Sequence, residues 1–378
     1  MVYFDYNATT PVLPEVRQAW MESLDQYPGN PSSRHRVGKR ADRAIENSRG
    51  QLADILGCDP LDLIWTSGAT ESSNIVLNHF HKTLQADEEL WVSAVEHPCV
   101  LASVHHYFPE RHRLLSVKES GELDLKAFSA LLCQRRPGAV VIMAANNETG
   151  VLQPWRDVMD LCREHGVPFF CDAAQWIGKL PSADLGKVDF VCGCAHKFGG
   201  PKGVGFLKCA GNDSLRPLFH GGEQLEGRRP GTENVPGILA MLRALEIRES
   251  QLAQEGTLER SRRSDRFISE IAGRIPECRL LGESAPRLWN TVTMMMPAVD
   301  CRVRWVVKLD KAGFAVSPGS ACASGNEEPS HVGLAMGLAQ EETGRVLRFS
   351  GGWETAAEDW NKLLEALVDI YRSLTPSG

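Results

Sequence analysis

Short, almost continuously apolar runs alternate with helical patterns through the first two thirds of the chain, and this alternation constrains the fold most strongly. Runs that are apolar on nearly every residue are typical of strands covered on both faces of a sheet. The six runs are Leu63–Ser67, Leu90–Val95, Ala139–Ala145, Val167–Ala174, Asp189–His196 and Gly203–Cys209. Between them, residues 38–57 and 154–166 have the spacing and the end signals of helices. The pattern predicts an α/β domain with a mainly parallel central sheet and helices on both faces.

The pattern changes after about Arg260. Residues 288–297 and 346–350 are typical of strands, and residues 302–313 and 354–374 are typical of helices. This predicts a second, smaller α+β unit, joined to the first by a long helical stretch from Val235 to Ile271. A length of 378 residues agrees with more than one packed unit.

Charge and hydropathy exclude several classes of partner. The net charge is −7, with acidic and basic residues interspersed, so we expect no direct nucleic-acid binding. Apolar runs such as Ala139–Ala145 are too short to span a bilayer, and residues 1–11 lack a secretory signal. We therefore expect a cytoplasmic protein with no membrane partner. The 11 cysteines are scattered without a disulfide framework, and most should be inert core residues.

Polar segments follow five of the predicted strands at their carboxyl ends. They are "TSGATESSN" (66–74), "EHPCV" (96–100), "NNETG" (146–150), "DAAQ" (172–175) and "AHKFGGPKG" (195–203). Ligands of open α/β sheets bind at this edge of the sheet. Five such segments together predict one composite site.

Two of these segments suggest an anion site and a partner for a cation. Gly68, Ala69 and Thr70 lie at a strand-to-helix turn, where free N–H groups and a hydroxyl can bind phosphate; a plain helix cap is the alternative. Asp172 ends an apolar strand, and it either caps the next segment or pairs with a cation such as a protonated cofactor ring. Pyridoxal 5′-phosphate (PLP) needs a carboxylate, a phosphate site and a lysine.

The segment "CGCAHKFGGPKGVG" (192–205) offers two lysines and a possible metal site. Cys192, Cys194 and His196 would share one side of a strand, but zinc sites need further ligands at typical spacings, so we expect no metal. The glycines do not form the Walker phosphate-binding pattern. Lys197 stands at the end of the strand, facing the predicted site, and is therefore better placed to reach a cofactor than Lys202, which lies in a turn.

One polar loop, residues 316–330, contains Cys322 among serine, glycine and alanine. Such a cysteine is available as a nucleophile, although an incidental surface cysteine is the alternative.

The motifs together resemble the cysteine desulfurases of the NifS/IscS type, in the class V aminotransferase branch of PLP enzymes. The resemblance runs from "YFDYNATTPV" through the five strand-end segments and "RRPGTENVPGI" to "GSACASGNEEPSHVGLAMGL" and "VLRFSGGW". It implies PLP fold type I, with a large PLP-binding domain at residues 15–258. A small domain, residues 1–14 and 259–378, would carry the catalytic cysteine loop. The implied reaction converts L-cysteine to L-alanine, with sulfur transferred to an active-site cysteine as a persulfide and then to an acceptor protein.

The resemblance also implies roles for individual residues. Lys197 would bind PLP as a Schiff base, and Cys322 would accept the sulfur. Asp172 would pair with the pyridine nitrogen, Gln175 with the ring hydroxyl, and His97 would stack on the ring and assist proton transfers. The phosphate would be bound by Ala69, Thr70, Cys194 and His196, together with Thr232 of a neighbouring subunit, which implies a homodimer. The substrate carboxylate would be bound by Asn147 and Arg348.

Three alternatives differ in chemistry. A selenocysteine lyase or a related PLP-dependent C–S lyase would share the site, a non-catalytic sulfur carrier would keep only the fold, and an ordinary aminotransferase would leave the Cys322 loop unexplained. Iron–sulfur cluster assembly, tRNA thiolation and DNA phosphorothioation are all compatible destinations for the sulfur. One residue departs from the family pattern: Cys194 stands where serine is usual, and because a thiol is the poorer donor, we expect weaker phosphate binding.

Overall fold

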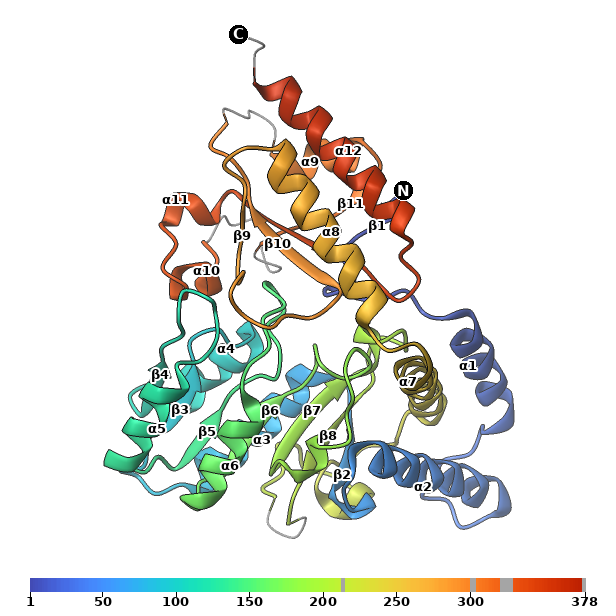
Figure 1. Cartoon of the computed structure of the whole chain (residues 1–378). Helices are drawn as coiled ribbons and strands as arrows, with labels where there is room; N and C mark the ends of the chain where they lie inside the picture. The colour runs from blue at the N-terminus through green and yellow to red at the C-terminus, as the bar shows by residue number, and fades with distance from the viewer. Residues whose placement is uncertain (212–214, 300–303, 320–328, 376–378) are drawn as a thin grey trace.

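A computed structural model describes residues 1–211, 215–299, 304–319 and 329–375 of the chain. Figure 1 shows two units, one built around a larger sheet and one around a smaller sheet, with the N-terminal segment passing between them. In the described part of the chain, no helix is both long and apolar enough to cross a membrane.

The larger unit contains a seven-stranded sheet in the order β2-β8-β7-β6-β5-β3-β4. Its neighbouring strands are parallel except at β8, which runs antiparallel to both β2 and β7. Since β2 therefore runs in the direction of β7, the carboxyl ends of the five strands with polar segments lie at one edge. The strands are β2 (Leu63–Thr66), β3 (Leu90–Ser93), β4 (His112–Leu115), β5 (Ala139–Val141), β6 (Phe169–Asp172), β7 (Phe190–Cys194) and β8 (Gly205–Cys209).

Helices lie on both sides of this sheet, which confirms the α/β prediction (Figure 1). One group is α3 with α4, another is α5 with α6, and a third is α7 with α1 and α2. The predicted end signals hold, since Gly57 caps the end of α2 and Gly166 follows α6, both with positive φ. The helices are α1 (Pro14–Gln26), α2 (Arg36–Leu56), α3 (Ala69–Thr83), α4 (Pro98–Tyr107), α5 (Leu125–Gln134), α6 (Trp155–Glu164) and α7 (Val235–Glu255).

The smaller unit has an antiparallel sheet in the order β12-β13-β10-β9, packed against α8 and α12. It has a core of its own, in which Phe4, Phe267, Phe349 and Trp360 are buried. The strands are β9 (Arg279–Leu280), β10 (Thr291–Met295), β12 (Ser317–Pro318) and β13 (Val346–Ser350). The helices are α8 (Leu258–Arg274), α9 (Trp305–Lys311), α10 (His331–Ala335), α11 (Gln340–Thr343) and α12 (Ala357–Leu374).

The helical stretch predicted from Val235 to Ile271 is two helices rather than one. Helix α7 ends before Gly256, where φ is +60°, and α8 starts two residues after this glycine. Glycine adopts this backbone conformation readily, whereas most residues in a helix do not. The break lets α8 leave the larger unit and pack against the smaller sheet.

Residues 2–13, called the N-terminal segment below, connect the two cores. Strand β1 (Val2–Tyr3) pairs with β11 (Phe314–Ala315) beside the smaller sheet, and Phe4 enters the smaller core. Further along, the Thr10 N–H donates to the carbonyl of His196 at 2.7 Å, and Leu13 belongs to the larger core. The residues between, from Asp5 to Thr9, are thereby held at the carboxyl edge of the larger sheet.

Candidate active site

A cavity of about 530 Å³ lies where the carboxyl ends of five strands meet the N-terminal segment and β13. Polar segments from β2, β3, β5, β6 and β7 converge on it, as the strand-end pattern predicted. The predicted site residues on its wall are Ala69, Thr70, His97, Asn147, Asp172, Gln175, Cys194, His196, Lys197 and Arg348.

Lys197 faces this cavity directly after β7. Its Nζ donates to the carbonyls of Asn7 at 2.5 Å and Ala8 at 3.0 Å, both in the N-terminal segment. Burial lowers the pKa of the Lys197 amine below its ordinary value, which favours the nucleophilic, uncharged form. Lys202 also touches the wall but is solvent-exposed, so Lys197 has the environment of a reactive amine.

Asp172 is a buried carboxylate at the end of β6, with 5 % of its surface exposed. It accepts a hydrogen bond from the Ala174 N–H at 2.9 Å, and its neighbour on β7 is Cys192. No lysine, arginine or histidine in the described ranges forms an ion pair with it. Asp172 therefore caps the segment that follows β6, as one of the two predicted alternatives had it. Its carboxylate also faces the cavity, where no cation among the described residues pairs with it.

The amino end of α3 forms the part of the wall where the sequence predicts an anion site. The helix starts after Gly68, an N-cap residue that has no side chain to accept from the first N–H groups. Glu71 instead accepts from the Ser67 N–H at 2.8 Å, and the Ala69 N–H donates to the Cys194 sulfur. Unpaired helix N-terminal N–H groups attract phosphate. His196 lies beside them, with its Nδ1 3.3 Å from the hydroxyl of Thr9.

His97 caps the first turn of α4, and this contact defines its tautomer. Its Nδ1 accepts from the Cys99 N–H at 3.2 Å, so the neutral ring carries its proton on Nε2. Burial lowers the pKa of His97, and the nearby Lys197 and His331 lower it further, although Asp172 opposes this. A neutral imidazole with one N–H therefore lies on the cavity wall.

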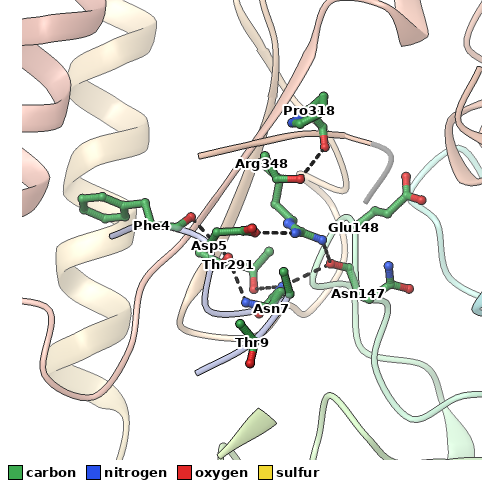
Figure 2. A network of polar contacts seen from close by, with 12 residues as sticks. Phe4, Asp5, Asn7, Thr9, Asn147, Glu148, Thr291, Pro318 and Arg348 are labelled. Carbon is green, nitrogen blue, oxygen red and sulfur yellow. Dashed lines mark hydrogen bonds and ion pairs between the residues drawn. The ribbon is translucent and has the colours of Figure 1, made fainter. Parts of the chain in front are cut away.

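Arg348 and Asn147 form another part of the wall, and Figure 2 shows the polar contacts around them. The guanidinium of Arg348 is completely buried in β13 and donates to Asp5 Oδ1 at 2.6 Å and to the Asn147 carbonyl at 2.8 Å. Its Nε has no partner among the described residues. The planar fork is thus oriented by two contacts and retains a free donor, an arrangement suited to a carboxylate.

The two remaining predicted residues are Thr232 and Cys322. Thr232 lies in the exposed segment before α7 and does not reach the cavity of its own chain. Cys322 lies outside the described residues. In the described ranges, no group of three or more histidine, cysteine, aspartate or glutamate side chains is arranged to bind a metal ion.

Three buried polar residues near the cavity were missing from the sequence prediction. Asn7 contacts Lys197 and Asn147, and it follows none of the predicted strands, so the strand-end rule could not find it. Glu96 and Glu148 belong to segments that were singled out, yet only their neighbours His97 and Asn147 were chosen. Burial raises the pKa of Glu148 to about 7 and raises that of Glu96 well above its ordinary value.

Comparisons with known proteins agree with the geometry. The family model of class V aminotransferases matches residues 2–363. The chain is 38% identical to a cysteine desulfurase of Cereibacter sphaeroides, over 100% of this chain and 98% of the relative. Among solved structures, a NifS-like protein of Rickettsia africae is similar with a TM-score of 0.87 and 29% identity, covering 98% of this chain and 99% of that one. SspA, solved in complex with cysteine, has a TM-score of 0.80 and 29% identity, covering 93% and 98%.

Proposed function

The chain belongs to the class V aminotransferase family and is a PLP-dependent cysteine desulfurase, and we propose that it transfers the sulfur of L-cysteine to Cys322 as a persulfide. One observation supports this most strongly. The amine of Lys197, the unpaired carboxylate of Asp172 and the uncapped amino end of α3 face one cavity of about 530 Å³. These three groups fit the aldehyde, the pyridine nitrogen and the phosphate of PLP.

The residues of the wall would hold the cofactor at both ends. Lys197 would bind it covalently, and Asp172 would keep its ring nitrogen protonated. Gln175 would contact the ring hydroxyl, and His97 would lie against the ring. When bound, PLP supplies an electron sink for the negative charge that develops at the substrate Cα. The phosphate would be bound by Ala69, Thr70, Cys194 and His196.

Arg348 and Asn147 would bind the carboxylate of L-cysteine. The guanidinium of Arg348 is oriented by Asp5 and by the Asn147 carbonyl before any ligand arrives. A preorganised fork loses little entropy when it binds a carboxylate in a bidentate manner. This orientation would direct the Cα–H of the substrate toward Lys197.

Lys197 would take the Cα proton once its amine is free. Burial lowers the pKa of this amine, so more of it is uncharged and able to accept a proton than in an exposed lysine. His97, with its proton on Nε2, would donate or receive protons on the other side of the substrate. The Cys322 thiolate would attack the substrate sulfur, so that an S–S bond forms as the C–S bond breaks. Protonation of the remaining three-carbon fragment would give L-alanine.

We also propose the organisation implied by the resemblance. Residues 15–258 would form the large PLP-binding domain, and residues 1–14 with 259–378 would form the small domain carrying Cys322. Exposure of Thr232 agrees with a role at the phosphate of a second copy, and therefore with a homodimer. A cytoplasmic sulfur-acceptor protein would receive the persulfide.

Sulfide and alanine release test this function. Purified protein is incubated with L-cysteine and a reductant, and both products are measured alongside Lys197→Ala, Cys322→Ala and the exposed control Lys202→Ala. We expect one alanine per sulfide in the parent protein and in Lys202→Ala, and loss of both products in the other two variants. Full sulfide release by Cys322→Ala would exclude the persulfide role. Turnover of selenocysteine but not of cysteine would favour a selenocysteine lyase, and an inactive parent protein that binds no PLP would favour a sulfur carrier.

A further inference from the structure

Lys179 is a buried lysine without a carboxylate partner. It lies in the turn after β6, and only 4 % of its surface is exposed. Its Nζ lies 2.5 Å from Gln175 Oε1 and 3.0 Å from Asn7 Oδ1. It forms no ion pair with any residue that the structure describes. Burying such a group without a partner of opposite charge is costly, which indicates a specific role for Lys179.

The surroundings of Lys179 favour its uncharged form. Burial lowers its pKa well below the ordinary value, and the positive charges of Lys197 and Arg348 lower it further. An uncharged amine has two N–H groups, which matches the two amide oxygens in contact with Nζ. Lys179 thus donates one hydrogen bond to the side chain of Gln175 and one to the side chain of Asn7.

These two contacts help to orient both amides, and a second donor, Asn290 Nδ2, also contacts Asn7 Oδ1 at 3.1 Å. An amide group can point either its oxygen or its NH₂ at a neighbour, and the hydrogen-bond network decides which. Because Nζ donates, it faces the oxygens of Gln175 and Asn7. The NH₂ of Gln175 is thereby turned to the other side, where Nε2 donates one hydrogen to the Asn7 carbonyl at 2.9 Å.

The second hydrogen of Gln175 Nε2 remains for a ligand in the cavity. Gln175 lies on the cavity wall, whereas Lys179 does not. The Asn7 amide is fixed in the same way, since its Nδ2 donates to the Asn147 carbonyl at 3.2 Å and to Thr291 Oγ1 at 2.9 Å. Neither amide can rotate without breaking at least two hydrogen bonds.

We propose that Lys179 is a positioning residue that holds the Gln175 amide with its N–H toward the cofactor, so that Gln175 donates to the deprotonated ring oxygen of PLP. This inference rests on the proposed function. Without Lys179, the amide could rotate and present its oxygen to the negatively charged ring oxygen, which would lose a hydrogen bond and add a repulsion. A hydrogen bond to a charged group contributes enough free energy to move a pKa by about one unit.

A double-mutant cycle on the holoenzyme tests this inference. PLP-loaded protein is titrated without substrate, and the midpoint of the pH-dependent visible absorbance is measured for Lys179→Met, Gln175→Ala and the double variant. Loss of a donor to the ring oxygen disfavours the deprotonated form, so we expect Lys179→Met to raise the midpoint by about one pH unit. Gln175→Ala should raise it similarly, and the double variant should match Gln175→Ala.

Additive shifts in the double variant would overturn the inference, because Lys179 would then act on the cofactor independently of Gln175. An unchanged midpoint in Lys179→Met would overturn it too. The matched control is Lys208→Met in β8, another buried lysine, with 2 % of its surface exposed, whose Nζ donates to the Val188 carbonyl. This control should lower stability without moving the midpoint.

A folding defect does not prevent the test. If Lys179→Met is not recovered folded, Lys179→Gln replaces it. The midpoint of Lys179→Gln is compared with that of the parent, and the same change is made in the Gln175→Ala variant. Any shift of the midpoint that Lys179→Gln causes in the parent must be absent in the Gln175→Ala variant. The proposed function fails in a different way, namely if the parent protein binds no PLP or releases no sulfide from L-cysteine.

Discussion

At the scale of single residues, the site consists of buried polar side chains that are oriented mainly by main-chain groups. Lys197 contacts two carbonyls, Arg348 contacts one, and His97 and Asp172 each accept a main-chain N–H. Main-chain partners cannot rotate away as side chains can, so they fix geometry at low entropic cost. Among the residues found only in the structure, Asn7 and Glu96 share this support, through the Asn147 carbonyl and the Met143 N–H.

Cys194→Ser should strengthen PLP binding. The Cys194 sulfur accepts the Ala69 N–H at the predicted phosphate site, and a serine hydroxyl in its place is the better donor to phosphate. One improved hydrogen bond contributes about 1 kcal/mol, so we expect an approximately fivefold lower Kd for PLP in a titration of the apoprotein. Cys209→Ser is the control, because Cys209 pairs with Phe190 at the other end of the sheet. An unchanged or higher Kd for Cys194→Ser would contradict the role of position 194.

Arg348→Lys should impair substrate binding more than turnover. Lysine keeps a positive charge but lacks the planar fork that contacts Asp5 and the Asn147 carbonyl. We expect KM for L-cysteine to rise at least tenfold, with a smaller change in kcat, because a lost carboxylate contact to a charged donor costs about 1.5–3 kcal/mol. Alanine formation is measured over a range of cysteine concentrations. An unchanged KM would place the substrate carboxylate elsewhere.

At the scale of elements, the buried strands and their polar ends could be predicted from the sequence. The contacts between segments distant in sequence could not. Apolar runs located six of the seven strands of the larger sheet, because strands buried on both faces are apolar throughout. Strand β4 was missed since it lies at the sheet edge and is partly exposed. Asn7 and Lys179 were missed for another reason. Their roles come from contacts with residues distant in sequence or from burial, and neither leaves a periodic pattern in the sequence.

Helix α10 is attached to the site by two contacts on the strand-end segments. Ser330 Oγ donates to Glu148 Oε2 at 2.5 Å, and the His331 ring lies 2.8 Å from the Glu96 carbonyl. Ser330 also caps α10 by accepting from the Gly333 N–H. Helix α10, which follows Cys322 in sequence, is thus held next to Glu148, the neighbour of Asn147.

Glu148→Gln should change stability in a pH-dependent manner. The folded-state pKa of Glu148 is raised to about 7 from an ordinary value of 4.5, so between these values the folded state binds more protons than the unfolded state. The parent protein therefore loses stability as pH rises through this window, and the loss persists above pH 7. Glutamine carries no charge, so Glu148→Gln should gain stability relative to the parent between pH 5 and pH 8, by up to about 3 kcal/mol.

Denaturant unfolding at the two pH values measures this difference. Glu164→Gln, an exposed site on α6, is the matched control for removing one carboxylate. If Glu148→Gln and Glu164→Gln have the same pH dependence, the carboxyl group of Glu148 is not perturbed by burial.

At the scale of the whole molecule, the cavity lies between two cores that the N-terminal segment joins. Phe4 packs edge-on against Trp360 in the smaller core, with ring centroids 4.7 Å apart, and Leu13 lies in the larger core. Asn7, between them, donates to Asn147 of the larger unit and to Thr291 of the smaller unit. The site thus depends on both cores holding this segment in place.

Phe4→Ala should therefore weaken both the fold and the site. Removing a fully buried phenylalanine costs about 3–5 kcal/mol, and the loss loosens the segment that carries Asn7. Phe267→Ala is the matched control, because Phe267 lies in the same core but outside the segment. We expect similar losses of unfolding free energy in denaturant, but a higher KM for L-cysteine only in Phe4→Ala. Equal KM values in Phe4→Ala and Phe267→Ala would show that loosening the N-terminal segment does not alter the substrate site.

The N-terminal segment also determines when the pocket can form during synthesis. The Asn7 N–H bonds to the hydroxyl of Ser350, 343 residues further along the chain. At ribosomal rates of about 5–20 residues per second, roughly 20 to 70 s separate the two residues. Throughout this interval Phe4 and Asn7 lack the partners that the C-terminal part of the chain supplies, Trp360 and Ser350. Cofactor loading is consequently a late event, which follows translation of nearly the entire polypeptide instead of accompanying it.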